Sequence, residues 1–188
     1  MLSPKDIGLS DTSGVYFIAE AGINHNGSLE KAKELVDLAK RAGADAVKFQ
    51  KRTISRILTK EGLNKIYNTP NSFGKTYGEH KEHLEFTYEQ FTELKNYADE
   101  VGIPLTASGW DEESVDFLDS INVPFFKMAS ADLTNHPLLE HTAKKGRPMI
   151  LSTGMANLDQ VIAAYEVVSV YNKQVGILQC TSSYPTEN

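Results

Sequence analysis

The chain has 188 residues, of which 40% are hydrophobic and 23% are charged. That composition suits one soluble, folded domain and excludes a disordered chain. The net charge of -6 argues against general binding to nucleic acid or to an anionic membrane, and no apolar run approaches the roughly 20 residues of a membrane helix. The single cysteine, Cys180, excludes an intrachain disulfide, and the amino terminus shows no signal-peptide pattern, so we expect a cytoplasmic protein.

Strand and helix patterns alternate along the chain. Hydrophobic segments predict six strands, at residues 15–22, 44–50, 103–109, 123–131, 147–154 and 175–185. Helical periodicity follows each strand except the last, and the predicted helices begin after typical capping residues: Ser28, Thr87, Asp111 and Asn157. Pro137 suits the first turn of a further helix. This alternation indicates a parallel sheet with helices packed outside it.

The alternation alone is compatible with two α/β folds, an open doubly wound sheet and a TIM (β/α)8-type barrel. A complete barrel needs eight strands and roughly 250 residues, so the second possibility is a barrel truncated after about six strands. The connection at residues 51–86 is unusually long and is rich in glycine, aromatic residues, lysine and histidine. It is either a charged surface lobe or a lid over the site, since long connections in compact domains are commonly functional.

Polar residues gather late in the predicted strands, where parallel α/β proteins hold their active sites. A lysine that faces the inside of a sheet structure is costly unless it is paired, so Lys48 and Lys127 beside Glu20 indicate an anionic ligand. A single serine at a strand end commonly hydrogen-bonds a neighbouring turn, and this interpretation stays open for each serine. The candidate site residues are Glu20, Lys48, Gln50, Ser108, Lys127, Ser130, Ser152, Ser182 and Tyr184.

Histidine and cysteine give no metal-binding pattern. His25 and His136 lie at loop-to-helix junctions, where a hydrogen bond to the turn is the commoner role, and no paired-histidine motif is present. Cys180 has no second cysteine nearby, and its position in the alternation predicts a packed core thiol.

Several separated motifs together resemble the sialic acid synthases. They are FIAEAGINHNGSLEKAKELVDLAKRAGADAVKFQ, NVPFFKMASAD, KKGRPMILSTGMA and LQCTSSYPT, and the resemblance runs from about Tyr16 to the last residue. The segments GKTYGEHKEHLEF and VGIPLTASGWDEESVDFL are most similar to the animal-type branch, which uses N-acetylmannosamine 6-phosphate.

The resemblance implies a TIM barrel followed by a small antifreeze-like domain. Residues 1–188 are then the amino-terminal portion, without strands seven and eight and without the second domain, and we expect this portion alone to be inactive. The implied reaction condenses phosphoenolpyruvate with N-acetylmannosamine or its 6-phosphate, and it yields N-acetylneuraminate or its 9-phosphate plus phosphate. The implied whole protein is a homodimer that uses manganese or magnesium, with metal ligands absent from this chain.

The resemblance also implies roles for single residues. Phosphoenolpyruvate is expected at Lys48, Ser108, Lys127, Ser130, Ser152 and Ser182, and the sugar at Gln50 and Tyr184. Glu20 matches the acidic active-site residue, which either handles the attacking water or holds a sugar hydroxyl. Two alternatives stay open: a synthase for another nonulosonic acid of the legionaminic or pseudaminic type, and a truncated, non-catalytic binding protein.

Overall fold

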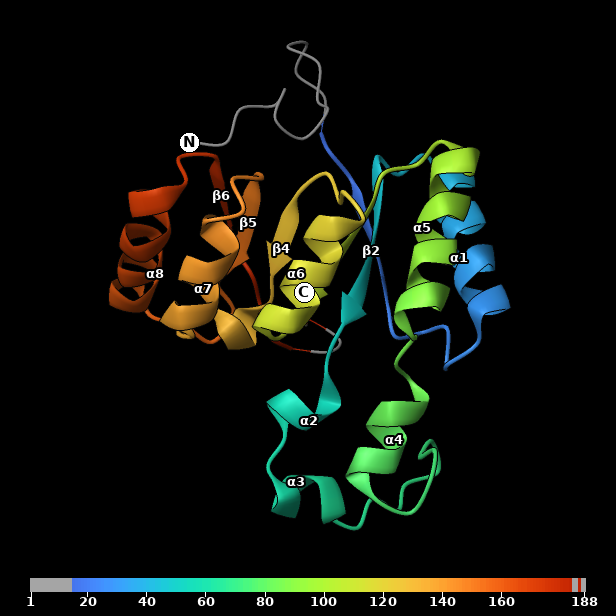
Figure 1. Ribbon diagram of the computed structural model, residues 1–188. Coiled ribbons are helices and arrows are strands. Elements are labelled where there is room, and N and C mark those ends of the chain that lie inside the picture. The colour runs from blue at the N-terminus through green and yellow to red at the C-terminus, as the bar shows by residue number, and fades with distance from the viewer. Residues whose placement is uncertain (1–14, 184–185, 187–188) are drawn as a thin grey trace. The chain divides into compact units, whose positions relative to one another are not determined.

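A computed structural model describes residues 15–183 and residue 186. Each of the six predicted strands is present, and they form two parallel sheets with the orders β1-β2-β3 and β4-β5-β6 (Figure 1). The strands are β1 (Ile18–Gly22), β2 (Ala46–Lys51), β3 (Leu105–Gly109), β4 (Phe126–Met128), β5 (Met149–Ser152) and β6 (Val175–Leu178). The chain divides into two compact units, of which Phe17–Ile121 holds the first sheet and Asn122–Asn188 the second.

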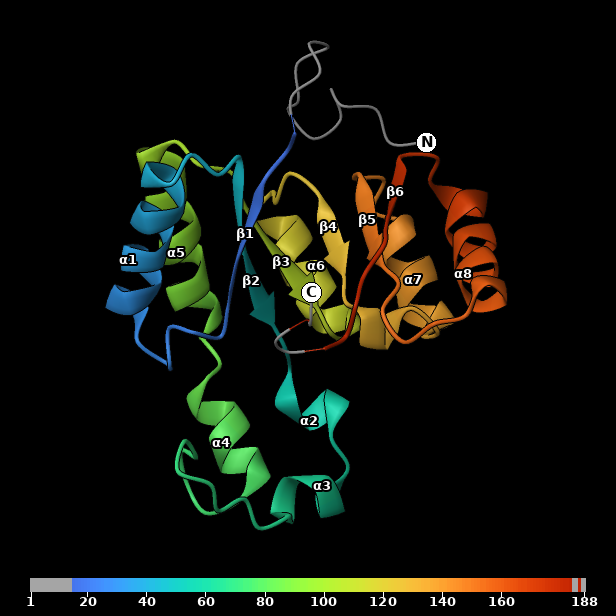
Figure 2. The same cartoon turned by 180° about the vertical axis from the view of Figure 1, so that it is seen from behind.

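Three helices accompany the first sheet: α1 (Leu29–Arg41), α5 (Tyr88–Val101) and α6 (Glu112–Ser120). Their starts confirm the predicted caps, since Thr87 forms a reciprocal capping box with Gln90 and the Asp111 carboxylate accepts from the Ser114 amide at 2.8 Å. Gly102 ends α5 in the left-handed conformation, with a φ of 76°. Helices α1 and α5 lie side by side along this sheet (Figures 1 and 2).

The candidate site residues Lys48 and Gln50 share one face of the central strand β2. Val47 and Phe49 are fully buried on one face, and strand alternation places Lys48 and Gln50 on the other. The parallel register sets Glu20 beside Lys48 and Ser108 beside Gln50. Three neighbouring strands therefore bring candidate site residues to the same face of the first sheet.

The long connection between β2 and α5 is a folded lobe (residues 51–86). It contains α2 (Ile54–Ile57), α3 (Lys60–Asn64) and α4 (Tyr77–His83), and it extends past the carboxyl end of β2 (Figure 1). It contains an aromatic cluster, in which Phe73 stacks on His83 with ring centroids 4.2 Å apart and on His80 at 5.8 Å. A capping box between Thr76 and Glu79 starts α4.

In the second unit, α7 (His136–Ala143) and α8 (Leu158–Tyr171) pack against each other and cover one face of the sheet β4-β5-β6 (Figure 2). Leu138 and Leu139 of α7 and Val168 of α8 are buried. A short 3-10 helix, η2 (Ser130–Asp132), follows β4. Among the described residues no helix has the length and apolarity needed to cross a membrane.

The sixth strand is shorter than predicted. It ends at Leu178, and Cys180 lies beyond it with a partly exposed side chain whose sulfur is 3.8 Å from the Leu178 carbonyl oxygen. The prediction of a packed core thiol was wrong, because the alternation that defined its face stops before Cys180.

Candidate functional site

Lys48 is the centre of a polar cluster in the first unit. Its side chain is only 6% exposed, and its Nζ lies 2.8 Å from Oε2 of Glu20, whose side chain is 57% exposed. The same Nζ donates to the Ser108 Oγ at 3.4 Å. Lys48 lies in the middle of β2 rather than at its carboxyl end, so the cluster lies inside the sheet and not at its edge. A buried ammonium beside a hydroxyl and an exchangeable carboxylate suits an anionic ligand.

Lys127 has a similar environment in the second unit. It is 5% exposed in β4, and its Nζ donates to the Ser152 Oγ on the neighbouring strand β5. A second hydrogen bond joins Nζ to the Met128 carbonyl oxygen at 3.3 Å. Each of the two candidate lysines thus has a candidate serine as a hydrogen-bond partner.

Ser130 and Ser182 meet over the backbone of Gly154, which follows β5. The Gly154 amide donates to the Ser130 Oγ at 3.0 Å. A Cβ added at Gly154 would lie 2.9 Å from that oxygen and would overlap the Ser182 Oγ. Only glycine allows this approach of two hydroxyl groups, and the sequence interpretation missed Gly154 although STG ends the predicted strand.

The structure thus brings the predicted residues together in two clusters. One contains Glu20, Lys48 and Ser108, with Gln50 next along β2, and the other contains Lys127, Ser130, Ser152 and Ser182. Tyr184 lies outside the described residues. Each cluster combines a buried ammonium with hydroxyl groups, which is the donor set that carboxylate and phosphate groups require.

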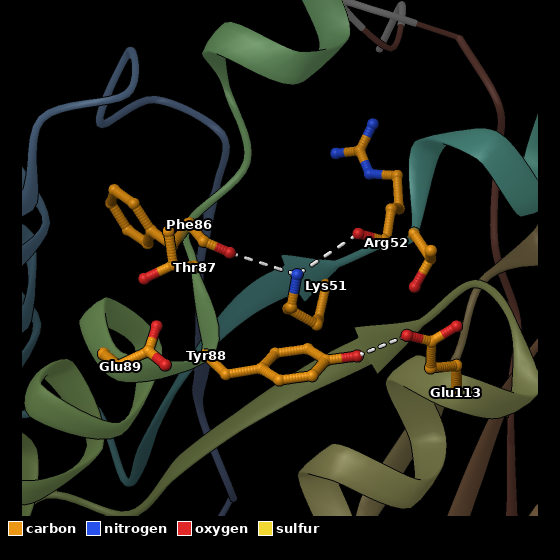
Figure 3. Close-up of a pocket in the computed structure, with 8 residues that line it drawn as sticks. Lys51, Arg52, Phe86, Thr87, Tyr88, Glu89 and Glu113 are labelled. Atoms are coloured by element: carbon orange, nitrogen blue, oxygen red, sulfur yellow. Dashed lines mark hydrogen bonds between the residues drawn. The ribbon is translucent and has the colours of Figure 1, made fainter.

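A pocket of about 350 Å³ lies on the opposite face of β2, where Lys51 points (Figure 3). The Lys51 Nζ donates to the carbonyl oxygens of Phe86 at 3.1 Å and Arg52 at 3.2 Å, above the ring of Tyr88. Burial lowers the pKa of Lys51. The pocket is lined by Lys51, Arg52, Thr53, Phe86, Thr87, Tyr88, Glu89 and Glu113.

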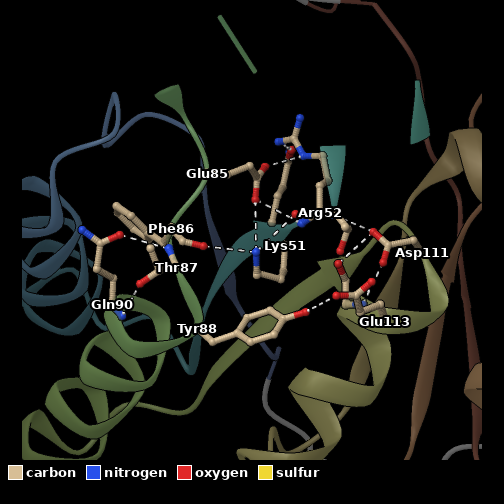
Figure 4. Close-up of polar contacts among 12 residues, drawn as sticks. Lys51, Arg52, Glu85, Phe86, Thr87, Tyr88, Gln90, Asp111 and Glu113 are labelled. Carbon is tan, nitrogen blue, oxygen red and sulfur yellow. Dashed lines mark hydrogen bonds and ion pairs between the residues drawn. The ribbon is translucent and has the colours of Figure 1, made fainter. Parts of the chain in front are cut away.

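Glu85 joins the two ends of the lobe (Figure 4). Its Oε1 lies 3.0 Å from the Arg52 Nε, and its Oε2 accepts from the Arg52 amide at 3.1 Å and lies 3.7 Å from the Lys51 Nζ. Burial raises the pKa of Glu85, and the charges of Arg52 and Lys51 oppose that rise. The sequence interpretation missed the ion pairs of Glu85 with Lys51 and Arg52. The opposite charges at the two ends of one long connection could have indicated them.

His25 confirms the predicted hydrogen bond to its turn. Its Nδ1 accepts from the Gly27 amide at 3.1 Å, which places the proton of the neutral ring on Nε2. The ring is 2% exposed and stacks on Phe86 with centroids 4.2 Å apart. Burial, with a smaller contribution from the charge of Arg52, lowers the pKa of His25 to about 4.

A metal site does not fit the described residues. Within residues 15–183 and 186, no three His, Cys, Asp or Glu side chains come together in a way that could hold a metal ion. We therefore assign no described residue as a ligand of manganese or magnesium.

A family model described as the NeuB family matches residues 35–188. The chain belongs to the NeuB family. It is 50% identical over 172 residues to human N-acetylneuraminate-9-phosphate synthase, and the match covers 92% of this chain and 48% of that protein. It is 42% identical over 178 residues to the N,N'-diacetyllegionaminic acid synthase of Legionella pneumophila, with 90% and 49% covered. The chain spans about half the length of these NeuB-type relatives.

A solved structure of a related synthetase has a similar fold. The N-acetylneuraminic acid synthetase of Leptospira borgpetersenii, crystallised with citrate, matches with a TM-score of 0.77 and 31% identity, over 93% of this chain and 57% of that one. The resemblance to sialic acid synthases, predicted from the motifs, is confirmed, and so is the parallel α/β class.

Proposed function

We propose that the whole protein is a sialic acid synthase, a transferase that condenses phosphoenolpyruvate with N-acetylmannosamine 6-phosphate or N-acetylmannosamine. The products are N-acetylneuraminate, or its 9-phosphate, and inorganic phosphate. The observation that carries this proposal is the pair of buried lysines, Lys48 and Lys127, each hydrogen-bonded to a serine hydroxyl in a NeuB-family chain.

In this proposal the two clusters bind the charged groups of phosphoenolpyruvate, which has a carboxylate and a phosphate. Charge-assisted hydrogen bonds from ammonium groups are the strong contacts for such oxygens, and hydroxyl groups satisfy the remaining lone pairs. The proposed phosphoenolpyruvate residues are Lys48, Ser108, Lys127, Ser130, Ser152 and Ser182.

The proposed reaction forms a carbon–carbon bond between the methylene carbon of phosphoenolpyruvate and the aldehyde carbon of the open-chain sugar. Water then adds to the carbon that carries the phosphate ester, and phosphate leaves. Glu20 is the proposed acidic residue, since its carboxylate is half exposed and is held by Lys48 at 2.8 Å. It orients or deprotonates the water, or it holds a sugar hydroxyl. Gln50 and Tyr184 are the proposed sugar contacts.

The fold and assembly of the whole protein that the resemblance implies belong to the same proposal. The six strands are assigned to one TIM barrel, with residues 1–188 as the amino-terminal portion of the synthase. The whole protein is proposed to be a cytoplasmic homodimer that uses a divalent cation. Such a cation would be held by residues outside the described ones and would supply a Lewis acid for the sugar aldehyde. Size-exclusion chromatography with light scattering on the full-length protein tests the dimer.

The identity of the sugar is the main alternative. The N,N'-diacetyllegionaminic acid synthase match, at 42% identity, is weaker than the 50% match to the human N-acetylneuraminate-9-phosphate synthase. That difference favours an N-acetylmannosamine-type sugar over a legionaminic or pseudaminic precursor.

The experiment measures phosphate release from phosphoenolpyruvate by the full-length protein with manganese and one sugar at a time. We expect turnover with N-acetylmannosamine 6-phosphate or N-acetylmannosamine. Mass spectrometry should identify the product as the corresponding acid. Turnover with only a diacetamido sugar would establish the legionaminic or pseudaminic alternative. Binding of phosphoenolpyruvate with no turnover of any sugar would establish a non-catalytic binding protein.

A further inference from the structure

The amide of Gln50 has a fixed orientation. Its Oε1 accepts a hydrogen bond from Nη2 of Arg52. Arginine has donors and no acceptor, so the atom of Gln50 that faces Arg52 must be the oxygen, and Nε2 must point elsewhere. Nε2 lies toward the end of β1, 3.8 Å from the position that a Cβ would take on Gly22. The amide therefore presents its two N–H donors away from Arg52.

The guanidinium of Arg52 is itself held from several sides (Figure 4). The side chain is 4% exposed, and its Nε lies 3.0 Å from the Glu85 Oε1. The other Glu85 oxygen accepts from the Arg52 amide at 3.1 Å, and the guanidinium carbon lies 5.3 Å from the centre of the Trp110 ring. A planar guanidinium with these contacts cannot turn to release Gln50 without breaking a buried ion pair.

We propose that Arg52 is a positioning residue that makes Gln50 a hydrogen-bond donor to the sugar substrate. This inference rests on the proposed function, in which Gln50 contacts the sugar. The group of the substrate that meets Gln50 is then an acceptor oxygen, from a carbonyl, a hydroxyl or a phosphate. A substrate that presents only donors there, such as a free ammonium group, is rejected because the N–H groups of Gln50 are left unpaired.

The first test is Gln50→Glu in the full-length protein. Glutamate has almost the same size and keeps an oxygen toward Arg52, but an oxygen replaces the Nε2 donor. We expect the KM for the sugar to rise about tenfold or more, the usual effect of a lost hydrogen bond, while the KM for phosphoenolpyruvate changes less than twofold. An unchanged KM for the sugar would mean that Gln50 accepts from the substrate or does not contact it, and would overturn the proposal.

The second test is a double-mutant cycle between positions 50 and 52. Arg52→Lys keeps a positive charge for Glu85 but lacks the planar fork that reaches Gln50, so we expect a several-fold higher sugar KM with little loss of thermal stability. In a Gln50→Ala background the same substitution should have no further effect on the sugar KM, since its target is gone. Independent, multiplicative effects would show that Arg52 does not act through Gln50.

The matched control is Arg56→Lys, an arginine of the same lobe whose side chain is 70% exposed. We expect no change in either KM. Activity of the parent protein separates the two proposals. A parent that turns over no sugar refutes the proposed function and this inference with it. An active parent in which the substitutions at positions 50 and 52 have independent effects on the sugar KM refutes the inference alone.

Discussion

The ammonium of Lys48 lies 2.8 Å from the carboxylate of Glu20, although the lysine side chain is 6% exposed and the glutamate side chain is 57% exposed. The two residues are register neighbours on β1 and β2, so the strand pairing itself sets the contact. A buried cation thus has a solvent-exposed counterion, and a half-exposed ion pair contributes little stability. An anionic ligand can take the place of Glu20 at Lys48 at low cost.

Glu20→Gln in the full-length protein should lower kcat without raising the KM for phosphoenolpyruvate. In the proposed function the substitution removes a group that orients or deprotonates water, and such groups commonly contribute about 100- to 10,000-fold. It also removes a negative charge beside Lys48, where the anionic substrate is proposed to bind. Steady-state kinetics checks both effects. The control is Glu30→Gln, whose side chain is 80% exposed on α1 and which should leave kcat unchanged. A normal kcat for Glu20→Gln would exclude a catalytic role for Glu20.

Local signals explain how much of the fold could be predicted from the sequence. The helix starts at Thr87, Asp111 and Asn157 were predictable because a capping side chain contacts an amide only three residues away. Strand alternation likewise placed Lys48 and Gln50 on one face of β2.

The remaining parts of the site depend on contacts between residues far apart in the chain. Glu85 meets Arg52 across 33 residues, and the lobe that brings them together has no periodic pattern of its own. Ser130 and Gly154 are likewise 24 residues apart in the chain, so their contact depends on the tertiary fold. Side-chain type and spacing could nominate Ser130, but they could not show that a backbone amide would be its partner.

Lys127→Met should weaken the binding of phosphoenolpyruvate far more than the binding of the sugar. Methionine keeps the packing of the lysine stem but removes the ammonium, and a charge-assisted contact is worth about 1.5–3 kcal/mol, or roughly 10- to 100-fold in affinity. Titration calorimetry with each substrate measures the two affinities. The control is Lys144→Met at the C-cap of α7, which removes an exposed partner of Glu140. An unchanged affinity for phosphoenolpyruvate would show that Lys127 is structural.

Glu85→Gln should destabilise the lobe. The substitution leaves Lys51 and Arg52 buried without their shared carboxylate, and breaking a buried pair from one side commonly costs about 3–5 kcal/mol. We expect a lower urea midpoint and faster tryptic cleavage after lysines of the lobe. Glu61→Gln, an exposed glutamate on α3, should change neither. Wild-type cleavage in the Glu85 variant would mean that aromatic packing alone holds the lobe.

His25 should make the protein less stable as the pH falls from about 7.5 to 5. Its folded pKa of about 4 lies below the unfolded value of 6.5, so the unfolded chain binds the extra proton in that range. The loss amounts to roughly 2 kcal/mol between those pH values, and it reaches its full extent only below pH 4. His25→Gln removes this titration, so its unfolding free energy should vary less with pH than that of the parent or of His136→Gln. Parallel pH curves for the three proteins would contradict the buried, neutral state of His25.

Gly154→Ala should impair phosphoenolpyruvate binding while the fold survives. The added methyl group would lie 2.9 Å from the Ser130 Oγ and would overlap the Ser182 Oγ, so both hydroxyl groups must move. The amide of residue 154 remains, but the Ser130 hydroxyl that it contacts at 3.0 Å is displaced. Because both serines are proposed phosphoenolpyruvate ligands, we expect its KM to rise about tenfold or more.

The control for that substitution is Gly62→Ala in α3, where an added Cβ would meet its nearest neighbour at an ordinary 3.5 Å. This second variant should keep the parent KM and gain slightly in stability, since alanine favours a helix over glycine by about 1 kcal/mol. The two variants add the same methyl group, so a difference between them reports the crowding at residue 154. If Gly154→Ala retained the parent KM with an unchanged melting temperature, the meeting of Ser130 and Ser182 over this glycine would have no part in substrate binding.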